Sequence, residues 1–288
     1  MGCKRELDQP LRFANGKYVF QANELQVEID PNTGGRITSF KLGNIDMLLQ
    51  KSINRENYGS TLWPSPQNWP WPPPPVLDRM AYAASIQGDT LNLSSYPDPV
   101  TGLQFSKSFW INSSKEALTI NYTITNISNK SISVGPWEVT RVPSGGICFF
   151  PSDYLTQLPS SNLKSTYTKS GTTWFKFDQK LVDTNQKLFQ GSRLGWLAHV
   201  NNGLLFVKQF PDVARNEVAP GQGEVEIFAD EYHTYIELEN HGTYAVLKPG
   251  ESLHYPTIWH LKYLSSNMKP EIFNQELIQA VNKIISYQ

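Results

Sequence analysis

Hydrophobic and polar residues alternate through most of the chain, in short runs that turn residues separate. The runs over residues 103–110 (LQFSKSFW) and 118–125 (LTINYTIT) are typical. Because successive side chains of a strand point to opposite faces, such runs predict strands with one buried face. Turn pairs such as Asn15-Gly16 end other runs, as they do in antiparallel hairpins. The pattern therefore predicts an all-β fold.

Helical spacing occurs only near the end of the chain. Pro270 stands where a proline at the first helical position would, and we expect the helix that follows to pack on the outside of the sheets. The sequence shows no internal repeat and no break in composition. We therefore predict a flexible N-terminus over residues 1–9 and a single domain over residues 10–288. The apolar stripe of the predicted helix consists of Ile272, Phe273, Leu277, Val281, Ile284 and Ile285.

The segment over residues 57–75 breaks the alternation, with three tryptophans and seven prolines. Proline lacks the backbone donor that a sheet ladder needs, so we predict a stiff loop here rather than a central strand. Two interpretations remain open. The loop covers a sheet edge or the end of the core, or it forms one wall of a ligand cleft to which Trp63, Trp69 or Trp71 offers a ring.

The composition excludes several classes of function for the protein. The 288 residues are 39% hydrophobic and 12% aromatic, with 8 Trp and 13 Tyr, which is enough for a large core and for stacking on flat-faced ligands. The formal net charge is -1 without a basic run, so we expect no nucleic-acid partner. Two cysteines exclude a disulfide framework, and Cys/His metal spacing is lacking. We expect neither a metal nor a cofactor.

The most informative strand lies within residues 233–263. A period of two places Tyr235, Glu237 and Glu239 on one face and apolar residues on the other. The two carboxylates are then roughly 6.5–7 Å apart. Unless both are fully solvated, one has a raised pKa and can act as an acid or a base near neutral pH. This face is either simply wet or the floor of a site.

Other polar residues lie at strand positions but form no recognised motif. Glu138 and Arg141 are in the sequence WEVTR, at positions that face opposite sides of a strand. His254 and His260 share one face of the last strand, and a lone histidine on a strand is more often structural than catalytic. Lys208 lies in another apolar run.

Four stretches, in their order along the chain, resemble a known superfamily. They are the turn at residues 34–40 (GGRITSF), a middle strand that ends in a polar residue, the glutamate strand followed by residues 249–251 (PGE), and the tryptophan-containing last strand. Together they look like the aldose 1-epimerase (galactose mutarotase-like) superfamily. The resemblance spans roughly residues 24–264. More narrowly, YGSTLWPSPQ, WEVTR and the order YIELEN, LKPGES resemble DUF4380-like proteins, a bacterial branch typical of sugar-degrading Bacteroidetes.

The resemblance implies a β-supersandwich with a sugar site on the concave face of one sheet. It also implies a glutamate that takes the proton of the anomeric hydroxyl and a histidine that protonates the ring oxygen. Either Glu237 or Glu239 would be the base. The segment over residues 135–141 lacks the expected histidine, and Glu138 would replace it as the acid. The predicted substrate-binding residues are Arg141, Lys208, Trp63, Trp71, Trp137 and His254.

Two function classes follow. The first is an enzyme that interconverts sugar anomers, and the second is a non-catalytic sugar-binding protein of the same fold. In either class we expect a mono- or oligosaccharide ligand and a monomer. Gly2-Cys3 resembles the trimmed end of a bacterial lipoprotein signal, which would attach the protein to a membrane in the periplasm or at the outer membrane. The alternative is a chance cysteine in a cytoplasmic protein.

Overall fold

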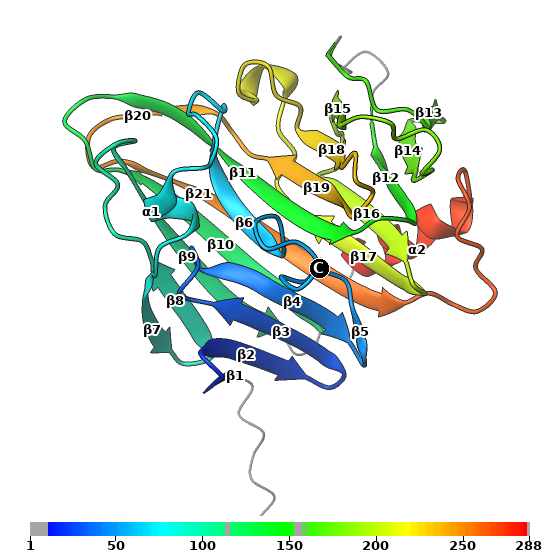
Figure 1. The fold of residues 1–288 in the computed structure, drawn as a ribbon, viewed down its shortest axis with the longest axis horizontal. Coiled ribbons are helices and arrows are strands. Elements are labelled where there is room, and N and C mark those ends of the chain that lie inside the picture. Colours follow the sequence, from blue (N-terminus) through cyan, green and yellow to red (C-terminus); the bar gives the residue numbers. More distant parts are fainter. Residues whose placement is uncertain (1–10, 113–115, 153–157, 159, 287–288) are drawn as a thin grey trace, which may run out of the picture.

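The computed structural model describes residues 11–112, 116–152, 158 and 160–286. The predicted flexible N-terminus, with Cys3, lies outside these residues. The described chain forms two antiparallel sheets that pack face to face (Figure 1). This confirms the predicted all-β fold with one C-terminal helix.

The first sheet has eleven strands in the order β1-β2-β3-β4-β6-β11-β19-β18-β15, with β5 paired to β4 and β20 to β11. Its central pair, β11 and β19, comes from parts of the chain about a hundred residues apart. The strands are β1 (Leu11–Ala14), β2 (Lys17–Ala22), β3 (Leu25–Asp30), β4 (Arg36–Leu42), β5 (Ile45–Asp46), β6 (Ser60–Ser65), β11 (Ile132–Pro143), β15 (Gln186–Gln190), β18 (Val225–Ala229), β19 (Tyr235–His241) and β20 (Ala245–Leu247).

The second sheet has ten strands in the order β13-β14-β12-β16-β17-β21-β10-β9-β8-β7. They are β7 (Ala83–Gln87), β8 (Thr90–Ser94), β9 (Leu103–Asn112), β10 (Ala117–Asn126), β12 (Ile147–Pro151), β13 (Thr166–Lys169), β14 (Thr172–Lys176), β16 (Trp196–Asn201), β17 (Leu204–Gln209) and β21 (Ser252–Tyr263). The helices are α1 (Pro75–Asp78), the 3-10 turn η2 (Arg215–Glu217) and α2 (Gln275–Ser286). Among the described residues, no helix is long and apolar enough to cross a membrane.

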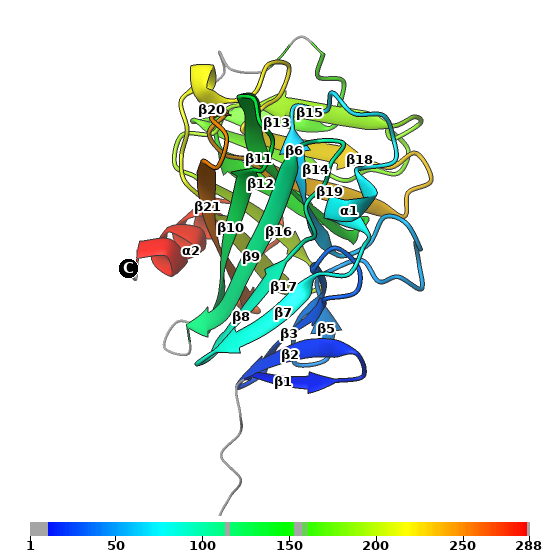
Figure 2. The same cartoon turned by 90° about the vertical axis from the view of Figure 1, so that its left-hand side faces the viewer.

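The main core fills the space between the two sheets. Its centre is aromatic: the ring centroids of Phe40 and Phe206 lie 5.4 Å and 5.2 Å from that of Trp259. A smaller core lies on the opposite face of the second sheet, where Leu277 and Val281 of α2 are buried. In Figure 2, α1 and α2 accordingly lie on opposite sides of the two sheets.

The C-terminal helix begins later than the sequence indicated. α2 starts at Gln275 rather than next to Pro270. The side chain of Asn274 accepts a hydrogen bond from the backbone N–H of Glu276 at 2.9 Å, which caps the helix at this point. The predicted stripe and its packing on the outside of a sheet are confirmed by the burial of Leu277 and Val281.

The prediction that residues 57–75 contain no central strand is wrong for its first part. Residues 60–65 form β6, between β4 and β11. Pro64 is tolerated because β6 pairs with β4 at Ile37–Ser60 alone, so no second strand lies beside the proline. On its other side Pro64 pairs with Pro136, which also lacks a donor, so the ladder is interrupted at a single rung.

One ion pair lies inside the main core. Lys208 Nζ of β17 is 3.0 Å from Glu138 Oε2 of β11, and both side chains are fully buried. Tyr122 donates a hydrogen bond to Glu138 at 2.7 Å, and Lys208 also donates to Thr140 at 2.8 Å. These bonds satisfy the two charges and join the sheets across the core.

We predict that Lys208→Met destabilises the protein by about 3–5 kcal/mol, because it leaves the Glu138 carboxylate buried without its cation. Urea unfolding measures this change. The control is Lys164→Met, which breaks the exposed pair with Asp183 and should leave stability nearly unchanged. Equal effects of the two substitutions would contradict the prediction.

Candidate functional site

The pairing of β11 with β19 builds the candidate site. Trp137, Val139 and Arg141 lie opposite His241, Glu239 and Glu237 on these two strands. The intervening residues of β19, Ile236 and Leu238, belong to the main core. The predicted two faces of this strand are therefore confirmed, and the carboxylates lie on the face turned away from the core.

A cleft of about 410 Å³ lies over this face of the first sheet. The proline-rich segment forms one wall of it. The strands β11, β15, β18 and β19 and the residue before β15 contribute the rest. Its lining combines aromatic rings, amides and two charged groups. The lining residues are Asn57, Trp63, Gln67, Trp71, Trp137, Asn185, Lys187, Phe228, Tyr235 and Glu237.

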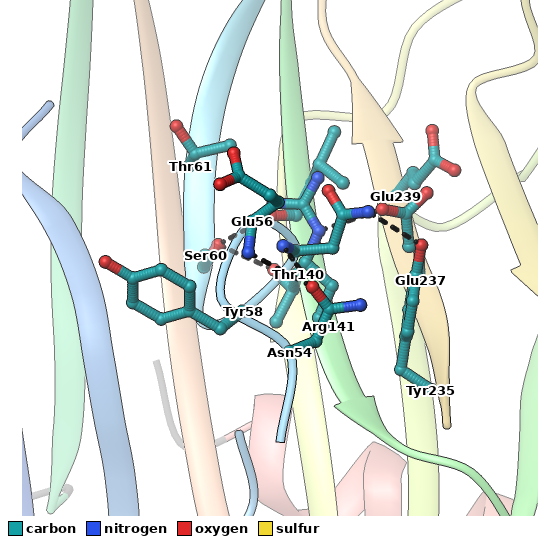
Figure 3. A network of polar contacts seen from close by, with 12 residues as sticks. Asn54, Glu56, Tyr58, Ser60, Thr61, Thr140, Arg141, Tyr235, Glu237 and Glu239 are labelled. Carbon is teal, nitrogen blue, oxygen red and sulfur yellow. Dashed lines mark hydrogen bonds and ion pairs between the residues drawn. The ribbon is translucent and has the colours of Figure 1, made fainter. Parts of the chain in front are cut away.

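Glu237 is the carboxylate that reaches the cleft. Arg141 Nε donates a hydrogen bond to Glu237 Oε1 at 2.8 Å, and the Glu237 side chain keeps 11% of its surface exposed. The Arg141 guanidinium lies 4.9 Å from the ring centroid of Trp63, so an indole covers it. Figure 3 shows Arg141 turned toward Glu237, with Tyr235, Glu237 and Glu239 along one strand. The ion pair holds the Glu237 side chain in place at the edge of the ligand space.

Glu239 lies beneath the cleft and is fully buried. Its Oε2 accepts hydrogen bonds from Trp137 Nε1 at 2.6 Å and from Lys187 Nζ at 2.8 Å. The pKa of Glu239 is raised to about 8, chiefly by burial and also by the charges of Glu226 and Glu237, against the opposing effect of Lys187. The expectation that one of the two glutamates has a raised pKa is confirmed. The structure also separates the pair, since only Glu237 lines the cleft.

Three buried ligand-type side chains meet under the cleft. One ligand atom each of Glu226, Glu239 and His241 lies within 4.8 Å of the others, as in a metal site. The ammonium of Lys187 is 2.7 Å from Glu226 Oε2 and 2.8 Å from Glu239 Oε2. A cation of the protein already occupies the position between the carboxylates. Lys187 therefore supplies the positive charge that a metal ion would bring to these carboxyl groups. The His241 ring stacks on that of Trp137, with ring centroids 5.2 Å apart.

The tryptophans of the cleft differ in their accessibility. Trp63 and Trp137 are 5% and 3% exposed, whereas Trp71 is 56% exposed. The ring of Trp63 is nearly perpendicular to both of the others, with centroids 5.1 Å from Trp137 and 5.8 Å from Trp71. Trp63 and Trp137 thus form a fixed base, and Trp71 presents a free ring. The interpretation of the segment as a cleft wall fits this arrangement.

Asp78 fixes Trp63 in place. Its buried carboxylate accepts hydrogen bonds from Trp63 Nε1 at 2.9 Å and from Arg36 at 3.1 Å. The helix α1 that carries Asp78 packs closely on the turn before Arg36. A Cβ at Gly34 would collide with the Asp78 carbonyl group, so this position requires glycine. The Gly34-Gly35-Arg36 motif of the sequence is therefore part of the support of the aromatic wall.

Three predicted site residues lie elsewhere, which corrects their assignment. Glu138 and Lys208 form the ion pair inside the main core, on the opposite side of the first sheet from the cleft. Glu138 therefore cannot reach a sugar in the cleft as its acid. His254 is exposed on β21 of the second sheet, where its Nδ1 lies 3.0 Å from Thr123 Oγ1. The cleft brings together Glu237, Trp63, Trp71 and Trp137 of the predicted set, with Arg141 and Glu239 beneath them.

The sequence pattern did not point to Lys187, Glu226 or His241 as site residues. Lys187 lies in the polar, irregular stretch after residue 152, where alternation is weakest. The short run QKLFQ that contains it carries a weak strand signal, and pairing of β15 at the far edge of the sheet is a non-local event. Glu226 precedes β19 on a neighbouring strand whose partner the pattern did not identify.

Residues 64–262 match a family described as a domain of unknown function, DUF4380. The chain belongs to the DUF4380 family. The matched segment includes β11, β15, β18 and β19, which supply most of the charged residues of the cleft and the group beneath it. No match was found among curated proteins.

Solved structures of low sequence identity share the fold of this DUF4380 protein. A galactose mutarotase-like protein from Lactobacillus casei has a TM-score of 0.63 at 11% identity, with 86% of this chain and 100% of that chain covered. A galactose mutarotase related enzyme from Lactobacillus acidophilus has a TM-score of 0.59 at 11% identity, with 88% and 99% covered. The protein therefore has the galactose mutarotase-like fold, which confirms the predicted fold.

A larger protein contains a similar unit. A TPR-domain containing protein from Parabacteroides distasonis has a TM-score of 0.63 at 14% identity. The similarity covers 90% of this chain but 49% of that one, so the present chain spans about half its length.

Replacing Glu239 by glutamine should remove a pH dependence of stability. The pKa of Glu239 is about 8 in the folded protein, above the ordinary value of 4.5, so the folded state holds a proton that the unfolded chain releases between these values. Its contribution to stability is present below pH 4.5 and is lost as the pH rises through about 8. We predict that the stability difference between wild type and E239Q falls by up to about 1.4 kcal/mol per pH unit in this window.

Chemical denaturation at several pH values measures this difference. Glu271→Gln, at an exposed carboxylate near α2, is the control and should leave the pH profile of the wild type unchanged. Profiles of E239Q and wild type that run parallel from pH 4.5 to 8 would show that Glu239 is ionised throughout.

Proposed function

We propose that the cleft binds a mono- or oligosaccharide, with the exposed ring of Trp71 stacked on a sugar and the Glu237 carboxylate accepting hydrogen bonds from its hydroxyl groups. The observation that carries the proposal is the position of an exposed indole and a carboxylate in the same cleft. The galactose mutarotase-like fold supports it, since carbohydrate-related proteins share this fold.

The size and chemistry of the cleft suit a sugar. Its volume of about 410 Å³ is at the lower end of ligand pockets, which span roughly 300–1,000 Å³. Amide side chains of Asn57, Gln67 and Asn185 add donors and acceptors around the apolar rings. A sugar presents both an apolar C–H face and a rim of hydroxyl groups, and the lining offers a partner to each.

A second function, interconversion of the anomers of the bound sugar, is favoured by the place of Glu237. It is the carboxylate on this strand that faces the ligand space, and a hydrogen bond from Arg141 Nε holds it in place. Glu237 would take the proton of the anomeric hydroxyl, the C1–O1 bond would become a carbonyl, and the bond from C1 to the ring oxygen would break. Rotation about C1–C2 and reclosure on the other face would complete the exchange.

Substitution of the two residues tests the binding function. We predict that Trp71→Ala weakens saccharide binding by about 3- to 10-fold, since a stacked ring contributes about 0.5–1.5 kcal/mol beyond its buried area. Glu237→Gln should weaken it by roughly 10- to 100-fold, because hydrogen bonds to a charged group contribute about 1.5–3 kcal/mol. Titration calorimetry against a panel of neutral, amino and acidic monosaccharides supplies the affinities.

The controls remove the same kinds of side chain at positions outside the cleft. Tyr96→Ala removes another exposed aromatic ring, and Glu271→Gln another exposed carboxylate. Both should bind as the wild type does. Binding that survives intact in Trp71→Ala and Glu237→Gln, or a panel without a single ligand, would rule out the proposed site.

A further inference from the structure

We propose that Lys187 donates the proton to the ring oxygen when the bound sugar opens, in the place of the histidine that the sequence lacks in the middle strand. This inference rests on the second proposed function, the interconversion of anomers. It assigns the acid to a residue on β15, at the edge of the first sheet, which is far in the sequence from the strand of the base.

Lys187 and Glu237 flank the cleft from two sides. Lys187 pairs with Phe228 across β15 and β18, and Phe228 pairs with Glu237 across β18 and β19. The three residues form one row, and two strand spacings separate the Cα atoms of its ends by roughly 10 Å. Both end residues line the cleft, and the Lys187 side chain keeps 20% of its surface exposed. A sugar ring between them meets a base on one side and an ammonium on the other.

The group beneath the cleft holds the ammonium in position. Lys187 Nζ lies 2.7 Å from Glu226 Oε2, 2.8 Å from Glu239 Oε2 and 5.0 Å from the ring centroid of Trp137. An ammonium has three N–H donors. One of them donates to Glu239 Oε2, and the ammonium also forms an ion pair with Glu226, so a further N–H can serve a ligand in the cleft that Lys187 lines. Two buried carboxyl groups thus fix one cation at the edge of the ligand space.

The other groups that line the cleft are less well placed to act as the acid. Among the described lining residues, Tyr235 is the second that can release a proton, and its pKa, like that of Lys187, is raised above the ordinary value. The two differ in position, since Tyr235 lies on the same strand as Glu237 and Lys187 lies two strands away. The Tyr235 hydroxyl also accepts a hydrogen bond from Asn57 at 3.1 Å. The remaining polar side chains are amides, which bind hydroxyl groups but do not transfer protons. His241 is buried under Trp137 and does not line the cleft.

Residues of the site supply and take up every proton that moves in this reaction. Glu237 takes the proton of the anomeric hydroxyl, the electrons of that O–H bond form the carbonyl at C1, and the electrons of the bond from C1 to the ring oxygen pass to that oxygen. The resulting alkoxide is more basic than an amine, so it takes a proton from Lys187 even though the neighbouring carboxylates favour the ammonium. On reclosure the ring hydroxyl returns its proton to Lys187, and Glu237 returns the other to the anomeric oxygen.

Two substitutions of Lys187 test the assignment. Lys187→Arg keeps the positive charge for Glu226 and Glu239, but a guanidinium does not release its proton. Lys187→Met removes both the charge and the proton. NMR exchange spectroscopy on a saccharide that the wild type binds gives the anomer exchange rate, and calorimetry gives the affinity of each variant. Lys164→Met, at an exposed lysine on the same chain, is the control.

We expect both Lys187 variants to lower the exchange rate by at least about 100-fold while the affinity changes by less than about tenfold, in line with the usual contribution of a general acid. Exchange at the wild-type rate in Lys187→Arg would show that the charge alone matters and would overturn the assignment. A wild type that binds sugar without accelerating exchange would also overturn it and would leave the binding function standing. Failure of the wild type to bind any sugar would remove the proposed function as well.

Discussion

The register between β11 and β19 is the constraint on which this site depends. It places Arg141 opposite Glu237, Val139 opposite Glu239 and Trp137 opposite His241. Because strand side chains alternate, the residues between them face the core, and a slip by one residue would exchange the two faces. Glu138 and Lys208 on the core side form an ion pair whose geometry requires the same register. Polar interactions on both faces of this pair of strands therefore specify one alignment.

Charge balance explains how so many ionisable groups can lie under one cleft. Isolated buried charges are costly, and each one here has an opposite charge close by. With Glu239 protonated, three buried ion pairs at the cleft and its support join three carboxylates to three cations. The carboxylates are those of Asp78, Glu226 and Glu237, and the cations are Arg36, Arg141 and Lys187. The balance leaves the cleft without a large net charge, which fits a neutral sugar better than a strongly charged ligand.

Local periodicity predicted some parts of this arrangement and could not predict others. The two faces of β19 and the opposite facing of Glu138 and Arg141 follow from a period of two within a single strand. The assignment of Glu138 as the acid fails because Glu138 faces the core. Which face of a strand is buried depends on the partner sheet, and the period of two does not reveal it. Lys187 was missed because its ion pairs bridge strands far apart in the sequence. The proline at position 64 did not exclude a strand, because β6 has no second neighbouring strand at that point. This is a property of the sheet and not of the segment.

The most direct test of a saccharide site on this face is the indole N–H region of the ¹H–¹⁵N NMR spectrum, followed while sugar is added. We predict that the signals of Trp63, Trp71 and Trp137 move. Those of Trp174 and Trp196 under α2, and of Trp259 in the main core, should stay in place as internal controls. Shifts confined to these three controls, or an unchanged spectrum at saturating sugar, would contradict the placement of the site over Glu237.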